Sequence, residues 1–326
     1  MSVPDPVRVS VVDPDRWRSR ADGPRFLYAA PGRLRAPWRL IAFAVALFIM
    51  RPIVESVLSP VFGGISRVVG EPVAAFEWIM LIATLGAIAF VLRTIDEAPW
   101  HDVALDAASW RIGVTLRGAL LGASAIAATI GVLWASGALH WVPYSVAGDS
   151  AMSSAQHGVA AWRATALRLA VMLAPAALWE ELIFRGYLWT VAESAGGVRI
   201  ARWSTAVAFG FIHITNPGAG VMTTVLVIVA GWCLGAIRER TGSLMSAWGA
   251  HFAWNWVMAA LVHVPVSGLA TETPGYRAVV SGPSWWTGGA WGPEGGAAAL
   301  LVMGGALLWL APPTGWRPFR TGSMAR

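Results

Sequence analysis

The chain has 326 residues, of which 56% are hydrophobic and 13% are charged, and its formal net charge is +6. Soluble domains usually carry about 25% charged residues, so this composition excludes an ordinary soluble protein and predicts a membrane domain. The positive charge does not imply a nucleic-acid partner, because basic residues of membrane proteins gather in cytoplasmic loops. The single cysteine, Cys233, lies in an apolar run and excludes an intramolecular disulfide.

The chain begins with a polar segment that is not typical of a cleavable signal peptide, because Asp, Pro and Arg residues precede the first apolar run. We interpret residues 1–36 as a cytoplasmic tail, residues 37–316 as one membrane domain and residues 317–326 as a short cytoplasmic tail. The loop 265–295 is rich in Gly and Trp and is expected to lie against the outer membrane surface, since Trp favours the membrane interface.

A transmembrane helix needs about 20 mostly apolar residues. Eight candidate stretches predict an all-α, polytopic membrane protein with about eight transmembrane helices. They cover approximately residues 38–62, 74–92, 113–136, 165–188, 203–216, 218–237, 243–264 and 296–313. Arg residues are concentrated before the first stretch and in alternate loops, so the positive-inside rule predicts a multi-pass protein of the cell membrane with both termini in the cytoplasm.

Three of the eight stretches carry polar or ionisable side chains in a coordinated pattern, although such side chains are rare there because a charge costs about 2.5–3.5 kcal/mol at the bilayer centre. The fourth contains Glu180, Glu181 and Arg185, the fifth contains His213, and the seventh contains His251 and Asn255. A lone His in an apolar helix is usually a packing residue. Three such stretches in one chain favour a functional site inside the helix bundle.

The spacing of these residues predicts that they converge. Residues four apart share a helix face, which pairs Glu181 with Arg185 and His251 with Asn255, while Glu180 is offset by about 100° around its helix. At a rise of 1.5 Å per residue, the acidic, imidazole and amide side chains lie about 12–18 Å from the expected cytoplasmic helix ends.

The order of these motifs resembles the CPBP family of intramembrane proteases, which includes the CAAX endopeptidases. The motifs are Glu-Glu-x-x-x-Arg at 180–185, Phe-x-x-x-His at 209–213 and His-x-x-x-Asn at 251–255. The resemblance covers about 165–260, with weaker similarity from about residue 95. The tail 1–36 and the loop 265–295 have no counterpart in it.

The resemblance implies an intramembrane endopeptidase that hydrolyses membrane-associated or peptide substrates. Glu180 would activate water with help from His213, and His251 and Asn255 would stabilise the oxyanion. In a supporting role, Glu181 would hold Arg185, and Phe209 belongs to the second motif. A carboxylate in a medium of low dielectric is a suitable general base near neutral pH.

Several alternatives remain open from the sequence. Glu180, His213 and His251 could form a zinc set, which would make the chain a metalloprotease, but a glutamate mechanism without cofactor is favoured because no His-Glu-x-x-His motif is present. A non-catalytic membrane scaffold or a bacteriocin self-immunity protein could use the same fold. The expected partners are a peptide or membrane-protein substrate and the lipid bilayer, with no nucleic acid.

Overall fold

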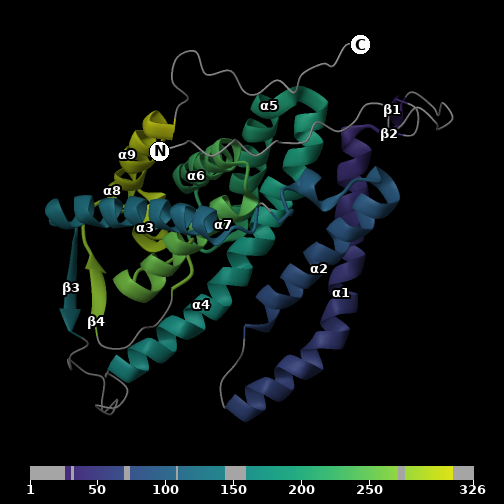
Figure 1. The fold of residues 1–326 in the computed structure, drawn as a ribbon. Helices are drawn as coiled ribbons and strands as arrows, with labels where there is room; N and C mark the ends of the chain where they lie inside the picture. Colours follow the sequence, from purple (N-terminus) through teal and green to yellow (C-terminus); the bar gives the residue numbers. More distant parts are fainter. Residues whose placement is uncertain are drawn as a thin grey trace.

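The computed structural model describes residues 26–30, 33–69, 74–107, 109–143, 159–270 and 276–310, and they form a bundle of α-helices (Figure 1). The α-helices of this part are α1 (Ala36–Val69), α2 (Ala75–Val91), α3 (Ile112–Ala135), α4 (Val159–Glu181), α5 (Leu188–Ile212), α6 (Val221–Thr241), α7 (Leu244–Trp256), α8 (Ser284–Thr287) and α9 (Ala297–Leu310). The predicted all-α fold class is confirmed, since each of the eight apolar stretches contains helix.

Shorter elements complete the fold. π-Helical segments extend α2 (Leu92–Asp96), join α4 to α5 (Leu182–Tyr187) and extend α7 (Val257–Val262), and 3₁₀ turns occur at Trp100–Val103, His213–Thr215, Gly289–Trp291 and Pro293–Gly295. Two antiparallel pairs of strands were not predicted. They are β1 (Tyr28–Ala30) with β2 (Arg33–Leu34), and β3 (Leu139–Pro143) with β4 (Tyr276–Val280). π-Helical segments are rare and are frequently found at functional sites.

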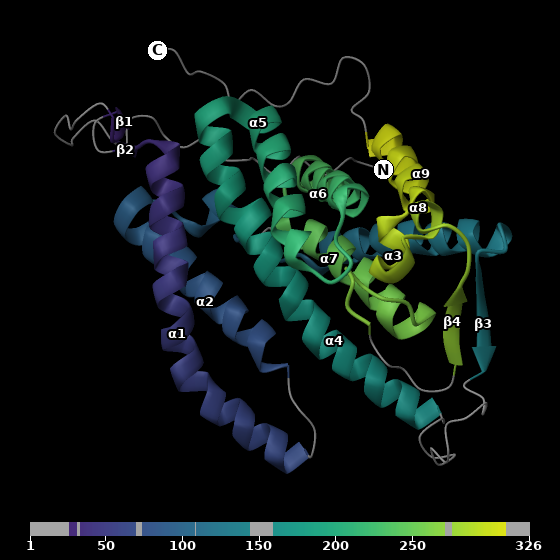
Figure 2. The same cartoon turned by 180° about the vertical axis from the view of Figure 1, so that it is seen from behind.

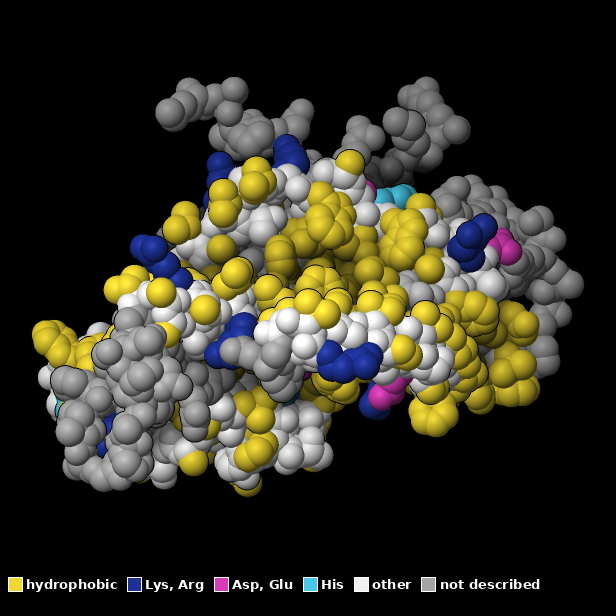
Figure 3. All heavy atoms as spheres, turned by 90° about the horizontal axis from the view of Figure 1, so that it is seen from below, with side chains coloured by type: hydrophobic (Ala, Val, Ile, Leu, Met, Phe, Trp, Pro, Cys, Tyr) yellow, Lys and Arg dark blue, Asp and Glu magenta, His cyan; other side chains and the backbone are white. Residues whose placement is uncertain are grey.

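The surface of the bundle is suited to lipid. Within the described residues, four helical stretches are long and apolar enough to cross a membrane by length and composition, namely Ala36–Val69, Ala75–Asp96, Ile112–Ala135 and Val221–Thr241. Large hydrophobic side chains such as Phe48 and Val57 on α1 are exposed, and hydrophobic side chains cover much of the described face in Figure 3. Exposed apolar surface on this scale is typical of a membrane protein.

A helical hairpin carries two of the predicted motifs. The helix that begins at Val159 continues through the π-helical segment to Gly196, and so extends beyond the end that the sequence predicted near Leu188. Gly197 then breaks the helix with φ 81°, a left-handed conformation that glycine adopts without steric cost. The second half of α5 returns as the other arm of the hairpin (Figure 2).

The two arms have matched lengths, and this brings their motifs to one level. Glu180 lies 17 residues before Gly197 and His213 lies 16 residues after it. At 1.5 Å per residue, both side chains are about 25 Å from the turn. Phe184 and Phe209, which lie 13 and 12 residues from Gly197, meet with ring centroids 5.3 Å apart.

Helix α3 lies across the direction of α1, α2 and α4 and packs on α7 (Figures 1 and 2). The contact depends on glycine, because a Cβ at Gly118 or Gly122 would clash with backbone atoms of α7, and a Cβ at Gly249 would clash with Thr115 of α3. Small residues of this kind allow membrane helices to approach closely. This close approach determines where α7 presents its polar residues.

The loop 265–295 is more deeply packed than the sequence predicted. Trp285 is exposed, as expected for an interfacial residue, but Trp291 is 1% exposed and packs with Phe184 and Phe209. The expectation that the whole loop lies on the outer surface is therefore wrong for its second half. Apolar composition alone cannot distinguish a Trp at the interface from one in the core.

The beginning of the membrane domain is anchored by a buried ion pair. Arg39 Nε, on α1, donates to Asp96 Oδ1 over 2.6 Å, and Arg39 Nη1 donates to Ser194 Oγ of α5. Most of the predicted cytoplasmic tail 1–36 and all of the tail 317–326 lie outside the described residues.

Candidate active site

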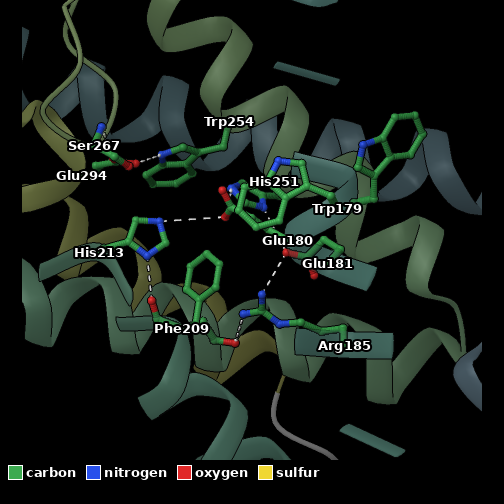
Figure 4. A network of polar contacts seen from close by, with 12 residues as sticks. Trp179, Glu180, Glu181, Arg185, Phe209, His213, His251, Trp254, Ser267 and Glu294 are labelled. Carbon is green, nitrogen blue, oxygen red and sulfur yellow. Dashed lines mark hydrogen bonds and ion pairs between the residues drawn. The ribbon is translucent and has the colours of Figure 1, made fainter. Parts of the chain in front are cut away.

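The polar residues predicted from the sequence come from four neighbouring elements. Glu180 and Glu181 end α4, Arg185 lies in the π-helical segment that follows, and His213 is the first residue of the 3₁₀ turn after α5. His251 and Asn255 lie on α7. Figure 4 shows the carboxylates, the guanidinium and the two imidazoles gathered inside the bundle.

Glu181 is the centre of a buried ion-pair network. Its Oε1 accepts a hydrogen bond from Arg185 Nη1 at 2.9 Å, and both side chains are fully buried. The same oxygen is 3.0 Å from His251 Nδ1, while Arg185 Nη2 donates to the Gly231 carbonyl at 2.8 Å. The sequence predicted the pairing with Arg185 but missed the contact with His251, which joins α4 to α7.

This contact determines the tautomer of His251. A carboxylate oxygen accepts hydrogen bonds, so His251 Nδ1 carries the proton that is shared with Glu181. The other ring nitrogen, Nε2, then faces Glu180 at 4.0 Å. The negative charge of Glu181 also stabilises a positive charge on this imidazole, as the aspartate of a catalytic triad does for its histidine.

His213 is oriented by its own helix end. Its Nδ1 donates to the Phe209 carbonyl at 2.7 Å, because a carbonyl oxygen can only accept. His213 Nε2 is therefore directed towards Glu180 Oε2, at 3.9 Å (Figure 4). The chain leaves the helix immediately afterwards, in the segment Asn216–Pro217–Gly218, whose Pro and Gly residues disfavour further helix.

Glu180 lies between the two imidazoles. Its Oε2 is buried and has no hydrogen-bond partner within the described residues. The separations of 3.9 Å and 4.0 Å from His213 Nε2 and His251 Nε2 are too long for direct hydrogen bonds. Polar atoms separated by more than about 3.5 Å are commonly bridged by water.

Phe209 packs against three members of this cluster. The guanidinium carbon of Arg185 lies 4.4 Å from the centroid of its ring. The rings of His213 and His251 lie 4.7 Å and 5.8 Å away, the latter edge to face. This aromatic ring therefore restricts the rotamers of the residues around it.

A cavity of about 100 Å³ adjoins the cluster. Its walls are mainly apolar and come from α3, α6, α7 and α9, with Leu121, Leu226 and Met303 among them. His213, His251 and Asn255 line it, whereas Glu180 is not among its lining residues. The structure thus places three of the four predicted catalytic side chains on one cavity and the fourth about 4 Å from both imidazoles.

A second carboxylate, Glu294, also lines this cavity and was not predicted from the sequence. It belongs to the 3₁₀ turn before α9 and accepts hydrogen bonds from Ser267 and Trp254. The sequence offers no motif that would single it out, because it lies in an irregular, Gly-rich loop. Its position depends on how that loop folds onto the bundle.

The zinc set that the sequence left as an alternative, Glu180, His213 and His251, is spaced more widely here than the ligands of a bound zinc ion. Tetrahedral zinc with bonds of about 2.0–2.1 Å holds neighbouring ligand atoms about 3.3 Å apart. Glu180 Oε2 lies 3.9 Å and 4.0 Å from the Nε2 atoms of His213 and His251. Throughout residues 26–310, apart from the gaps in the description, no three His, Cys, Asp or Glu side chains are arranged to hold a metal ion.

Acidic, imidazole and amide side chains thus meet beside an apolar cavity, inside a bundle of apolar helices. Residues 162–257 match the family model described as Type II CAAX prenyl endopeptidase Rce1-like. The matched range contains the whole cluster from Glu180 to Asn255 and is consistent with the resemblance to CPBP intramembrane proteases. This similarity indicates a protease domain of the CAAX type.

Searches of curated proteins and of solved structures found no match to the chain. Glu294 lies outside the matched range 162–257.

Proposed function

We propose that this protein is an intramembrane endopeptidase in which Glu180 activates the water that attacks the peptide bond. One observation carries the proposal: a buried carboxylate oxygen of Glu180 faces the Nε2 atoms of both His213 and His251, at 3.9 Å and 4.0 Å. A carboxylate flanked by two imidazoles at these distances is suited to hold a water between them. The match to a CAAX-type protease domain supports the same reaction class.

In this mechanism Glu180 and His213 orient the nucleophile. One water proton points to Glu180 Oε2 and the other to His213 Nε2, whose lone pair is available because Nδ1 donates to Phe209. The water oxygen then presents a lone pair to the substrate carbonyl. A positioned general base of this kind typically contributes about 10²–10⁴-fold to the rate.

His251 and Asn255 stabilise the negative charge that develops on the carbonyl oxygen. With His251 protonated, its Nε2–H and the Asn255 amide are two donors on the cavity wall. Two carboxylates, Glu180 and Glu181, then balance the Arg185 guanidinium and the His251 imidazolium. The net charge of these four groups is zero, and this lowers the free-energy cost of burying them at low dielectric.

The protons and bonds balance without a further reactant. The bond from water oxygen to carbonyl carbon forms as Glu180 takes the water proton. The peptide C–N bond then breaks as Glu180 passes that proton to the leaving amine. The products are a carboxylic acid and an amine, and Glu180 is again a carboxylate.

The expected substrate is a peptide or a membrane-associated protein that reaches the site from the bilayer. The apolar walls of the cavity suit an apolar group beside the scissile bond, since few polar side chains other than those of the site line it. The decisive test is cleavage of a peptide library by the purified protein, read by mass spectrometry. A preparation that cleaves nothing, under conditions where it is folded, would leave the scaffold function as the better proposal.

Metal removal tests the favoured cofactor-free mechanism. Because Glu180 is proposed to act as a base rather than as a ligand, we expect the cleavage rate to be unchanged after exhaustive dialysis against a chelator. The control is a zinc protease treated in parallel. Loss of activity that returns on addition of zinc would instead make Glu180, His213 and His251 metal ligands.

We further propose a multi-pass topology in the cell membrane with both termini in the cytoplasm. In support, α1 ends, and α2 and α4 begin, at one end of the fold, while the turn inside α5 lies at the other (Figures 1 and 2). Arg199 and Arg202 follow that turn, as expected for its cytoplasmic side. Reporter fusions at residues 145 and 280 should both be active only outside the cytoplasm. A cytoplasmic signal at either position would reject this topology.

A further inference from the structure

Glu294 is a carboxylate that faces the same cavity as His213, His251 and Asn255. Its Oε1 accepts hydrogen bonds from the backbone N–H and the hydroxyl of Ser267, at 2.6 Å and 2.7 Å. Its Oε2 accepts one from the indole of Trp254, at 3.0 Å. Figure 4 shows this group beside His213 and His251. The Ser267 N–H and the Trp254 indole can only donate, so each oxygen of Glu294 faces a donor that needs an acceptor.

The hydrogen-bond partners of Glu294 link the turn after α5, which bears His213, to α7, which bears His251 and Asn255. The Asn216 amide donates to the Ser267 carbonyl at 3.0 Å, and Asn216 lies three residues after His213. At the other end, Trp254 lies three residues after His251 and directly before Asn255 on α7. A continuous chain of hydrogen bonds therefore joins the turn that bears His213 to the helix face that bears His251 and Asn255.

The loop at Ser267 needs to be held in place. Ser267 has φ 48°, in the left-handed region that a residue with a side chain rarely adopts. The neighbouring Gly268 packs so tightly on the His213 turn that a Cβ there would clash with the Pro217 carbonyl. The two hydrogen bonds from Ser267 to Glu294 stabilise this conformation and keep the loop against the turn.

We propose that Glu294 is a positioning residue of the proposed active site: through Ser267 and Trp254, it sets the placement of His213 relative to His251 and Asn255 across the cavity. It does not touch the reacting atoms. The expected effect on catalysis rests on the proposed function. The structural link from Glu294 to Ser267 and Trp254 can be measured without any substrate.

Kinetics give the first test. Glu294→Gln keeps the shape, but an amide has a single acceptor atom and cannot serve the donors on both sides. We expect kcat to fall by about 10- to 100-fold, because small misplacements of catalytic groups are costly, with KM changed less than about twofold. Glu294→Asp, which keeps both acceptors on a shorter side chain, should be less impaired than Glu294→Gln.

The matched control is Glu193→Gln. Trp189 donates to Glu193 at 2.9 Å, so this variant removes the carboxylate charge from the same type of Trp–carboxylate pair on α5, away from the cavity lining. With a single donor to serve, the amide oxygen can still accept from the indole. It should retain the parental kcat. If Glu294→Gln keeps full kcat, or if Glu193→Gln loses as much, Glu294 has no positioning role.

A double-mutant cycle with Trp254→Phe tests the route through the indole. Trp254→Phe removes the indole donor. In the Glu294→Gln variant the amide oxygen can then accept from Ser267, and the amide NH₂ no longer faces the N–H of an indole. Glu294→Gln should therefore cost less in the Trp254→Phe background than in the parent protein. Equal costs in the two backgrounds would show that Glu294 and Trp254 act independently, contrary to the proposal.

Cys233 provides the test that needs no activity. It is the only cysteine of the chain and it lines the cavity, so its reaction rate with a small thiol reagent reports access to that space. Freeing the Ser267 loop by Glu294→Gln should raise the rate several-fold, with no rise in Glu193→Gln. An unchanged rate in folded Glu294→Gln would overturn this structural link. If Glu294→Gln raises the rate but the parent protein has no peptidase activity, the hold of Glu294 on the Ser267 loop stands and only the proposed function is rejected.

Discussion

Replacing Glu180 with glutamine is expected to reduce kcat by about 10²–10⁴-fold while the protein still folds. The amide has nearly the same shape as the carboxylate but cannot accept the water proton. Glu180 Oε2 makes no hydrogen bond within the described residues, so the substitution breaks no hydrogen bond of that oxygen. A neutral amide is also no harder to bury than a carboxylate. Cleavage rates and thermal unfolding of the purified variant would measure both effects.

Two comparisons sharpen this prediction. Glu77→Gln changes another carboxylate in the same region, since Glu77 Oε2 accepts from the indole of Trp179, next to Glu180 in the chain, at 2.9 Å. This control should keep near-parental kcat. Asn255→Ala removes one of two proposed oxyanion donors and should leave measurable turnover, at a cost of about 10²-fold. Full activity in Glu180→Gln would refute the glutamate mechanism.

Replacing Glu181 with glutamine is expected to reduce both stability and rate. The fully buried Arg185 guanidinium would lose its carboxylate, and an unpaired buried charge typically costs about 3–5 kcal/mol of unfolding free energy. His251 would also lose the charge that stabilises its protonated form, so kcat should fall by at least about 100-fold. The sequence alone predicted a structural role for Glu181, and its contact with His251 adds the effect on the rate.

A double variant separates the two effects of Glu181. Glu181→Gln combined with Arg185→Met removes both members of the buried ion pair and leaves no uncompensated charge. We expect part of the lost stability to return, because replacing a whole buried pair costs less than breaking it. The rate should stay low, since His251 still lacks its carboxylate. A double variant that recovers rate together with stability would indicate that Glu181 acts on the fold alone.

The sequence by itself determined the class of fold and the residues of the cluster. Composition and the length of the apolar runs depend only on the local cost of burying polar groups in lipid, and they predicted the all-α class correctly. The pairing of Glu181 with Arg185 also follows from local geometry, because residues four apart on a helix are neighbours wherever the helix lies.

Only the tertiary structure decided how these helices are arranged. The hairpin turn at Gly197 sets Glu180 and His213 at one level, and the glycine contacts between α3 and α7 place His251 beside Glu181. The burial of Trp291 and the position of Glu294 depend on a loop without periodicity, folded onto the bundle. Such contacts join residues far apart in the chain, and their geometry comes from close packing of helices and loops, which no local pattern of residues encodes.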